Sequence, residues 1–396
     1  MKALRKYLDK IKPNFEEGGK HPKLKSTFEA FESFLFVPNE TTGAKGAHIR
    51  DAVDLKRTIT MVIIALLPAL FFGMWNVGYW HHEMTGEEAG FFCNLFYGLG
   101  QVLPIIAVSY ISGLFLEFMF AQIRKEQVNE GFLATGLLIP MIVPVDCPLW
   151  MVAIATMFAV LIGKEVFGGT GMNIVNPALL ARAFLFFAYP GKMSGDKVWV
   201  AGLGDADKVA DGFSGATPLG ELAHGTAFDA LTVGKGEPLS ILDMFLGYMP
   251  GSIGETSTLC ILIGAVILIW TGVASWKIMV SGVLGVLFMG GLLNYFGDST
   301  YAQVPFWSHL LLGGFAFGIV FMATDPVTAA QTETGKWIYG FLIGVVAILV
   351  RVVNPAFPEG VMLAILLMNV CAPLIDHIVV RQNVKRRLNR AKAAVN

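Results

Sequence analysis

The chain has 396 residues, of which 55% are hydrophobic and only 15% are charged, and its formal net charge is −1. An ordinary soluble domain carries about 25% charged residues, and a soluble fold of this size cannot bury so much apolar surface. The near-neutral charge also excludes an overall basic field for nucleic acid. The composition therefore predicts a polytopic membrane protein.

Ten mostly apolar runs are candidates for membrane-spanning helices. A span needs about 20 apolar residues, and fewer where protein encloses part of the helix. The third and fifth runs are short and flanked by Gly and Pro, which indicates broken or half-length helices. We therefore expect an all-α fold of about ten transmembrane helices, near residues 58–79, 99–120, 131–145, 149–167, 177–190, 256–272, 275–296, 307–324, 337–353 and 360–380.

The distribution of Lys and Arg predicts the orientation of these helices. Residues 1–57 carry twelve of these cations and the tail after residue 380 carries six, whereas the loops at 80–98, 146–148 and 297–306 carry none. Because Lys and Arg accumulate in cytoplasmic loops, we expect both termini in the cytoplasm, which an even number of spans allows. The long polar segment 191–255 is then extracytoplasmic.

A weak internal repeat divides the chain into two parts. Asn176-Pro177-Ala178 recurs as Asn354-Pro355-Ala356, and Pro144-Val145-Asp146 stands at nearly the same offset from Ala323-Thr324-Asp325. With ten spans, this repeat predicts two five-helix halves, which are inverted because the number of helices per half is odd. The expected divisions are a basic N-terminal segment (1–57), a first repeat (58–190), the extracytoplasmic segment (191–255), a second repeat (256–380) and a cytoplasmic tail (381–396).

The cysteines give no support for a transition-metal site. Cys93, Cys147, Cys260 and Cys371 are far apart in sequence, and none belongs to a CxxC or Cys/His ligand pattern. Zinc, iron–sulfur and disulfide frameworks are therefore not expected.

A run of small residues in the extracytoplasmic segment presents a hydroxyl to a modifying enzyme. Ser214-Gly215-Ala216-Thr217 precedes Pro218-Leu219-Gly220. A Thr hydroxyl on such a turn is accessible, and the small Gly and Ala leave room for a bulky group. Taken alone, four small residues are far more often an ordinary surface turn.

This motif resembles the flavinylation motif of the B subunit of the sodium-translocating NADH:quinone oxidoreductase, a family related to the D subunit of the Rnf complex. The resemblance covers nearly the whole chain. It includes Lys164-Glu165-Val166-Phe167-Gly168-Gly169-Thr170-Gly171, Asn173-Ile174-Val175-Asn176-Pro177, Phe184-Leu185-Phe186-Phe187-Ala188-Tyr189-Pro190, Gly251-Ser252-Ile253-Gly254-Glu255-Thr256-Ser257 and Thr324-Asp325-Pro326.

The resemblance implies two flavins. FMN would be esterified to Thr217 by a flavin transferase acting outside the cytoplasm, and riboflavin would bind without a covalent bond at Asn173 and Asn176. An Asn before Pro can equally cap a helix. Ser252 and Thr256 could hydrogen-bond a flavin phosphate at a helix N-terminus, although the neighbouring Glu255 favours plain capping there.

Three acids are candidates for the ion pathway. Glu117 lies in an apolar run, where a charged carboxylate costs at least about 2.5 kcal/mol. Asp325 and Asp376 stand near the ends of the eighth and tenth runs, where water can also solvate them. The resemblance implies that all three take part in sodium uptake and translocation. It also places a quinone near the N-terminal segment and the region of Gly113, Glu117 and Phe132.

The function implied is electron transfer in a redox-driven sodium pump. Electrons would pass from a partner's FMN through FMN and riboflavin of this chain to a quinone, while another subunit, with flavin and an iron–sulfur centre, oxidises NADH. The expected location is the bacterial inner membrane. Two alternatives stay open: an Rnf-type D subunit, which is expected to lack the long N-terminal segment, and a secondary transporter or channel without flavin.

Overall fold

The computed structural model describes residues 2–15, 19, 20, 25, 27, 28, 32, 36, 55–124, 128, 131–204, 209–354, 357 and 359–395. Most of the predicted N-terminal segment, together with Pro355 and Ala356 of the predicted repeat, lies outside these residues. Among those described, helices dominate, as the composition predicts, and the one sheet is a small hairpin.

The first part of the chain forms a bundle of long and short helices. Pro68 and Pro104 lie inside the two longest of them, α3 and α4. The described helices of this part are α1 (Lys2–Ile11), the 3₁₀ helix η1 (Lys12–Asn14), α3 (Leu55–Thr85), α4 (Phe91–Arg124), α5 (Phe132–Met141), α6 (Leu149–Gly163), the 3₁₀ helix η3 (Glu165–Phe167) and α7 (Pro177–Ala188).

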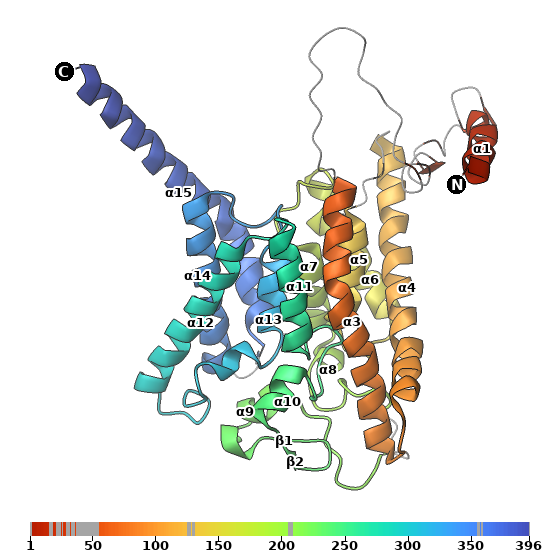
Figure 1. The fold of residues 1–396 in the computed structure, drawn as a ribbon, viewed down its shortest axis with the longest axis vertical. Coiled ribbons are helices and arrows are strands. Elements are labelled where there is room, and N and C mark those ends of the chain that lie inside the picture. The colour runs from red at the N-terminus through yellow and green to blue at the C-terminus, as the bar shows by residue number, and fades with distance from the viewer. Residues whose placement is uncertain are drawn as a thin grey trace.

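The segment after α7 folds against one end of the bundle. Its elements are α8 (Pro190–Met193), α9 (Pro218–Ala223), η5 (Phe228–Ala230), β1 (Thr232–Val233), β2 (Glu237–Pro238) and α10 (Ile241–Leu246). The two strands pair antiparallel, with Thr232 opposite Pro238. Figure 1 shows this segment at the end of the bundle opposite to both chain termini, as expected if it lies on the other side of the membrane.

The second part of the chain repeats the alternation of long and interrupted helices. The predicted span at 307–324 is a broken element, in which a short α-helix continues as a π-helix. The elements are α11 (Thr258–Trp270), α12 (Trp276–Phe296), the 3₁₀ helix η6 (Ser308–Leu310), α13 (Phe315–Phe317), the π-helix η7 (Gly318–Met322), α14 (Glu333–Val353) and α15 (Val361–Val395).

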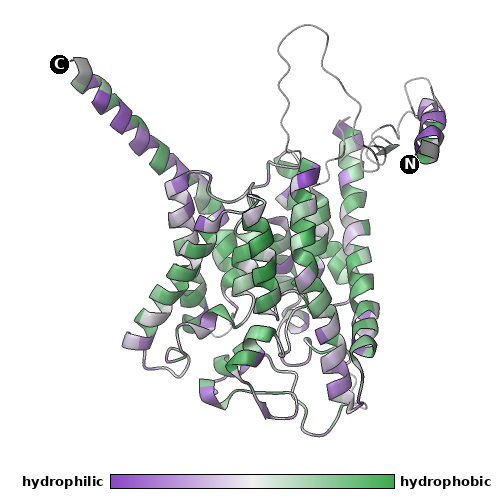
Figure 2. Ribbon diagram, viewed as in Figure 1, coloured by the Kyte–Doolittle hydropathy of each residue, from purple (hydrophilic) through white to green (hydrophobic). Residues whose placement is uncertain are grey.

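The helices have the lengths and surfaces of a membrane protein, which confirms the predicted class. Among the described residues six helical segments are long and apolar enough to cross a membrane, and three shorter apolar helices accompany them. Large apolar side chains such as Phe115 and Val266 are more than 60% exposed, a surface that suits lipid rather than water. Figure 2 shows hydrophobic residues along the helices and hydrophilic ones at the C-terminal end of α15. The inverted relation of the two halves stays a prediction.

Small residues allow the closest helix contacts. A Cβ atom on Gly98 of α4 would lie 1.7 Å from the Met74 carbonyl oxygen of α3, and one on Gly344 of α14 would lie 2.2 Å from the Gly282 carbonyl oxygen of α12. Neither distance is possible for a larger residue. Helices in lipid gain no hydrophobic driving force, and close packing of this kind is one of the forces that associate them.

Candidate functional site

The predicted flavinylation motif lies at the start of α9. The Ser214 amide donates to the Gly234 carbonyl oxygen at 2.8 Å, which ties the motif to the β1–β2 hairpin. A Cβ on Gly215 would lie 2.5 Å from the Asp196 carbonyl oxygen, so this position requires glycine. Thr217 is half-buried and caps α9, with its Oγ1 accepting from the Gly220 amide at 3.1 Å.

Thr217 stands on the wall of a cavity of about 420 Å³, which we call the first cavity. This volume lies within the range of ordinary small-molecule sites. Apolar and aromatic side chains cover much of the wall and polar side chains the rest; its residues include Phe186, Asp196, Trp199, Thr217, His224, Met249, Glu255, Thr256, Phe357 and Glu359. The motif is thus adjacent to a space of suitable size for a large cofactor.

A buried ion cluster borders the first cavity. Arg182 of α7, only 6% exposed, is ion-paired with Glu359 and lies 3.7 Å from Glu255, measured from Nη1 to Oε2. The other oxygen of Glu255 accepts from the Ser252 amide at 3.2 Å. Glu255 therefore does not cap α11, a role that Ser257 takes with its Oγ accepting from the Cys260 amide.

The two residues predicted beside Glu255 lie in different surroundings. Thr256 contributes to the wall of the first cavity. Ser252 is fully buried, and its hydroxyl has no hydrogen-bond partner within the described part of the chain.

A second buried guanidinium lies close by. Arg351 of α14 is fully buried and donates to the carbonyl oxygens of His309 and Leu312, both at 3.1 Å. His309 lies in the connection before α13, outside the apolar helices, and is 1% exposed. The Nδ1 atom of the His309 ring lies 3.4 Å from Nη1 of Arg351.

A second cavity, of about 140 Å³, opens among α3, α5, α7 and the loop after η7. Its wall unites residues predicted separately, namely Asn173, Asn176 and Asp325, with Lys164. Asn176 caps α7, since its Oδ1 accepts from the amides of Ala178 and Leu179 at 3.0 and 3.2 Å. Because the cap uses only Oδ1, the Nδ2 group of Asn176 can still donate a hydrogen bond to another group.

Asn369 of α15 connects the surroundings of this cavity. Its Oδ1 accepts from the Asn176 main-chain amide at 3.1 Å, and the Tyr339 hydroxyl lies 2.8 Å from its Nδ2. At 1% exposure it links α7 to α14 and α15. Asn369 is not among the predicted site residues, although an amide within an apolar run is a signal of the same kind as the acids.

Glu117 of α4 is ion-paired with Lys164, which immediately follows α6, and each is 5% exposed. Lys164 was not predicted as the partner of Glu117. A second ion pair joins the same elements, with Arg124 Nη1 lying 2.9 Å from Glu165 Oε2. The two pairs fasten the C-terminal half of α4 to the end of α6.

The other residues of the predicted quinone region pack beside Glu117. A Cβ on Gly113, one turn before Glu117, would lie 1.9 Å from Cζ of Phe132, whose side chain is 1% exposed. The structure thus brings Gly113 and Phe132 into contact and places Glu117 on the same helix. In this structure the Phe132 ring lies directly against Gly113.

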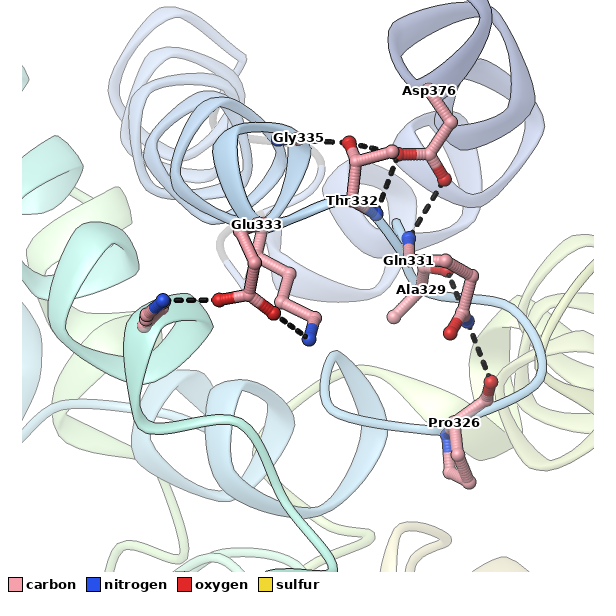
Figure 3. Close-up of polar contacts among 9 residues, drawn as sticks. Pro326, Ala329, Gln331, Thr332, Glu333, Gly335 and Asp376 are labelled. Carbon is pink, nitrogen blue, oxygen red and sulfur yellow. Dashed lines mark hydrogen bonds and ion pairs between the residues drawn. The ribbon is translucent and has the colours of Figure 1, made fainter. Parts of the chain in front are cut away.

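The two aspartates predicted from the sequence, Asp325 and Asp376, accept hydrogen bonds from loop residues. Asp376 of α15 accepts from the amides of Gln331 and Thr332 at 2.7 and 2.9 Å and from the Thr332 hydroxyl, fastening the loop before α14 (Figure 3). Asp325 accepts from the Thr328 hydroxyl at 2.9 Å and faces the second cavity. In the described part of the chain no three His, Cys, Asp or Glu side chains are placed to hold a metal ion.

Comparison with known proteins identifies relatives along the whole chain. The model of the NQR2, RnfD, RnfE family matches residues 42–385. Proteins named as the B subunit of a Na(+)-translocating NADH-quinone reductase are similar throughout. The protein from Ectopseudomonas mendocina (strain ymp) is 48% identical over 413 residues, covering 98% of this chain and 99% of its own. The one from Yersinia pestis is 45% identical over 421 residues, covering 98% and 100%.

Proposed function

The chain belongs to the NQR2, RnfD, RnfE family, and we propose that it is the B subunit of a sodium-translocating NADH:quinone reductase. The full-length similarity to proteins of that name supports the proposal. In this role it carries electrons through the membrane, while another subunit of the complex oxidises NADH. A flavin takes one or two electrons, so it can join one-electron relays to a two-electron quinone.

The observation that carries the proposal is the position of Thr217 on the wall of the first cavity. FMN would be attached there through a phosphoester to Oγ1. In capping α9, Oγ1 acts as an acceptor, so the cap does not need the hydroxyl proton that esterification removes. The cavity volume suits a bulky ring system, and so do the aromatic residues on its wall, Phe186, Trp199 and Phe357.

The second cavity is the proposed site of riboflavin. Asn173, Asn176 and Asp325 offer the hydrogen-bonding groups that an isoalloxazine edge and ribityl hydroxyls require. At about 140 Å³ the cavity is smaller than typical ligand sites. A three-ring flavin therefore requires the surrounding α3, α5 and α7 to move apart relative to this structure.

In the proposed route, electrons arrive from a flavinylated partner subunit outside the membrane and leave to a quinone near Gly113, Glu117 and Phe132. Sodium moves outward, with Glu117, Asp325 and Asp376 along its path. The basic N-terminal residues and tail support a cytoplasmic location of both termini in the bacterial inner membrane. A flavin transferase then meets Thr217 on the extracytoplasmic side.

Flavin fluorescence of the denatured chain tests the proposal. The complex is produced in a host that supplies the flavin transferase, and the chain is separated on a denaturing gel. We expect a fluorescent band that Thr217→Ala abolishes and Thr226→Ala, a change of the half-buried Thr that follows α9, leaves intact. A dark band for the unaltered chain, with the transferase active on a control substrate, contradicts the proposal and favours a flavin-free transporter.

Membership of the family also leaves an Rnf-type D subunit as the second candidate. The relatives named as the B subunit match 98% of this chain, and the chain covers 99% or more of their own length. This end-to-end agreement, which includes the N-terminal region, favours the NADH-quinone reductase.

A further inference from the structure

The C-terminal part of α15 extends beyond the helix bundle. Val379 is 7% exposed, whereas every side chain from Val380 to Ala393 is exposed. At a rise of 1.5 Å per residue, this exposed stretch is about 20 Å long. Figure 1 shows it leaning outward on the side of α12 and α14, away from the other helices. We call residues 380–395 the tail helix.

The tail helix has a high positive charge. It contains no Asp or Glu, and its six cations are Arg381, Lys385, Arg386, Arg387, Arg390 and Lys392. Pairs such as Arg386 and Arg390 stand four residues apart, where like charges destabilise a helix in water. The helix dipole favours cations only in the last turn, which holds Lys392 alone. The other cations therefore favour an anionic surface outside this chain.

Apolar residues form a stripe along the same helix. Val380, Val384 and Leu388 follow one another at intervals of four residues and are 50%, 49% and 57% exposed. With about 3.6 residues per turn, all three lie on one side of the helix. Leu388 also stands about five turns after Val370, which is 59% exposed in the apolar part of α15. The stripe thus continues a side of α15 that suits lipid.

Cations border this stripe on both sides. By the same helical geometry, Arg381 and Lys385 lie on one side of the stripe and Arg387 lies on the other. Long basic side chains can keep their stems beside apolar groups while their charges reach the headgroups. This arrangement is typical of helices that lie at a bilayer surface. The continuity with the lipid-facing side and the outward lean favour a bilayer over an acidic protein surface.

We propose that the tail helix binds anionic phospholipid headgroups at the bilayer surface, with Val384 and Leu388 at the boundary between headgroups and acyl chains. Basic residues directly after a membrane-spanning helix are attracted to such a surface. No residue of the tail helix lines the first or the second cavity. The interaction requires neither a flavin nor sodium, so it goes beyond the proposed function.

Energy transfer in nanodiscs tests this proposal on the intact complex. A donor fluorophore is attached enzymatically to a short tag after the C-terminal residue, and a small fraction of the lipid headgroups carries an acceptor. We expect more transfer in an equal mixture of phosphatidylcholine and phosphatidylglycerol than in phosphatidylcholine alone. High salt should abolish the difference, because it screens the charges.

Variants separate the contributions of charge and of the apolar stripe. Lys385→Gln with Arg387→Gln should lower the bound-to-free ratio of the tail about 30-fold, since each basic residue near an anionic surface contributes about five-fold. Leu388→Gln keeps every charge and should lower the ratio about five-fold, because a leucine side chain is no longer partly buried. The matched control, Lys6→Gln with Lys10→Gln, removes two exposed cations of α1 and should leave the transfer unchanged.

Transfer that does not depend on phosphatidylglycerol overturns the proposal. Transfer that depends on phosphatidylglycerol but not on Leu388 also overturns it, because a solvated basic tail would give that result. If the variant with Lys385→Gln and Arg387→Gln instead loses another subunit of the complex on a native gel, the tail helix binds an acidic protein surface and the proposal is wrong.

Discussion

Replacing Arg182 by methionine should destabilise the protein strongly. Methionine keeps much of the arginine stem's packing but removes the cation that joins Glu255 and Glu359. Glu255 is 7% exposed, and its Oε2 has no hydrogen-bond partner among the described residues. Removing one partner of a buried ion pair leaves an uncompensated charge, which costs about 3–5 kcal/mol.

The matched control is Lys277→Met. Lys277 of α12 pairs with Glu333 of α14, whose side chain is 64% exposed and also has Lys336 as a partner at 2.8 Å. Exposed pairs contribute about 0–1 kcal/mol. Each variant thus removes the cation of an ion pair, which is buried for Arg182 and exposed for Lys277.

The stabilities of the two variants are compared by unfolding the purified proteins in mixed micelles with increasing amounts of a denaturing detergent. We expect the Arg182→Met midpoint to fall well below that of Lys277→Met. Adding Glu255→Gln to Arg182→Met should recover a large part of the lost stability, since it removes one of the carboxylates left without a cation. Equal midpoints for the two single variants would show that the Arg182 cluster is not a tightly buried ion pair, and would refute the reasoning.

Two further predictions concern the ion and the quinone. Glu117→Ala should raise the sodium concentration required for half-maximal quinone reduction, whereas full activity with an unchanged sodium dependence would remove Glu117 from the mechanism. Gly113→Ala should displace the Phe132 ring, 1.9 Å from the added Cβ, and raise the quinone KM several-fold; a steady-state titration with quinone checks this, and an unaltered KM counts against the region.

The sequence predicted the helices well because lipid imposes a simple rule on composition. Every predicted run coincides with helical structure, and the runs expected to be short or broken include α5 and α7. The position of the 191–255 segment opposite the termini also follows from the loop charges (Figure 1). The π-helical turn at Gly318–Met322 could not be predicted, because hydropathy does not record which backbone carbonyl a given amide reaches.

The candidate sites were predicted one residue at a time, and the sequence did not show how they meet. Asn173, Asn176 and Asp325 share a cavity only because α7 and the loop after η7 pack together. Carboxylates in apolar runs were recognised, but the cations Lys164 and Arg182 were not, although the same energetic argument applies to them. Their partners lie 47 and 177 residues away, so no local pattern could reveal the pairs.

The chemistry of the two buried cations suits different tasks. Arg182 presents a planar fork that holds Glu255 and Glu359 together, and a guanidinium stays charged in any protein environment. Such a group stabilises one arrangement of α7 and the segments around the first cavity. Lys164 offers a single flexible ammonium with one carboxylate partner and an adjoining cavity. Arg182→Met should therefore reduce stability without changing the sodium affinity of the folded complex.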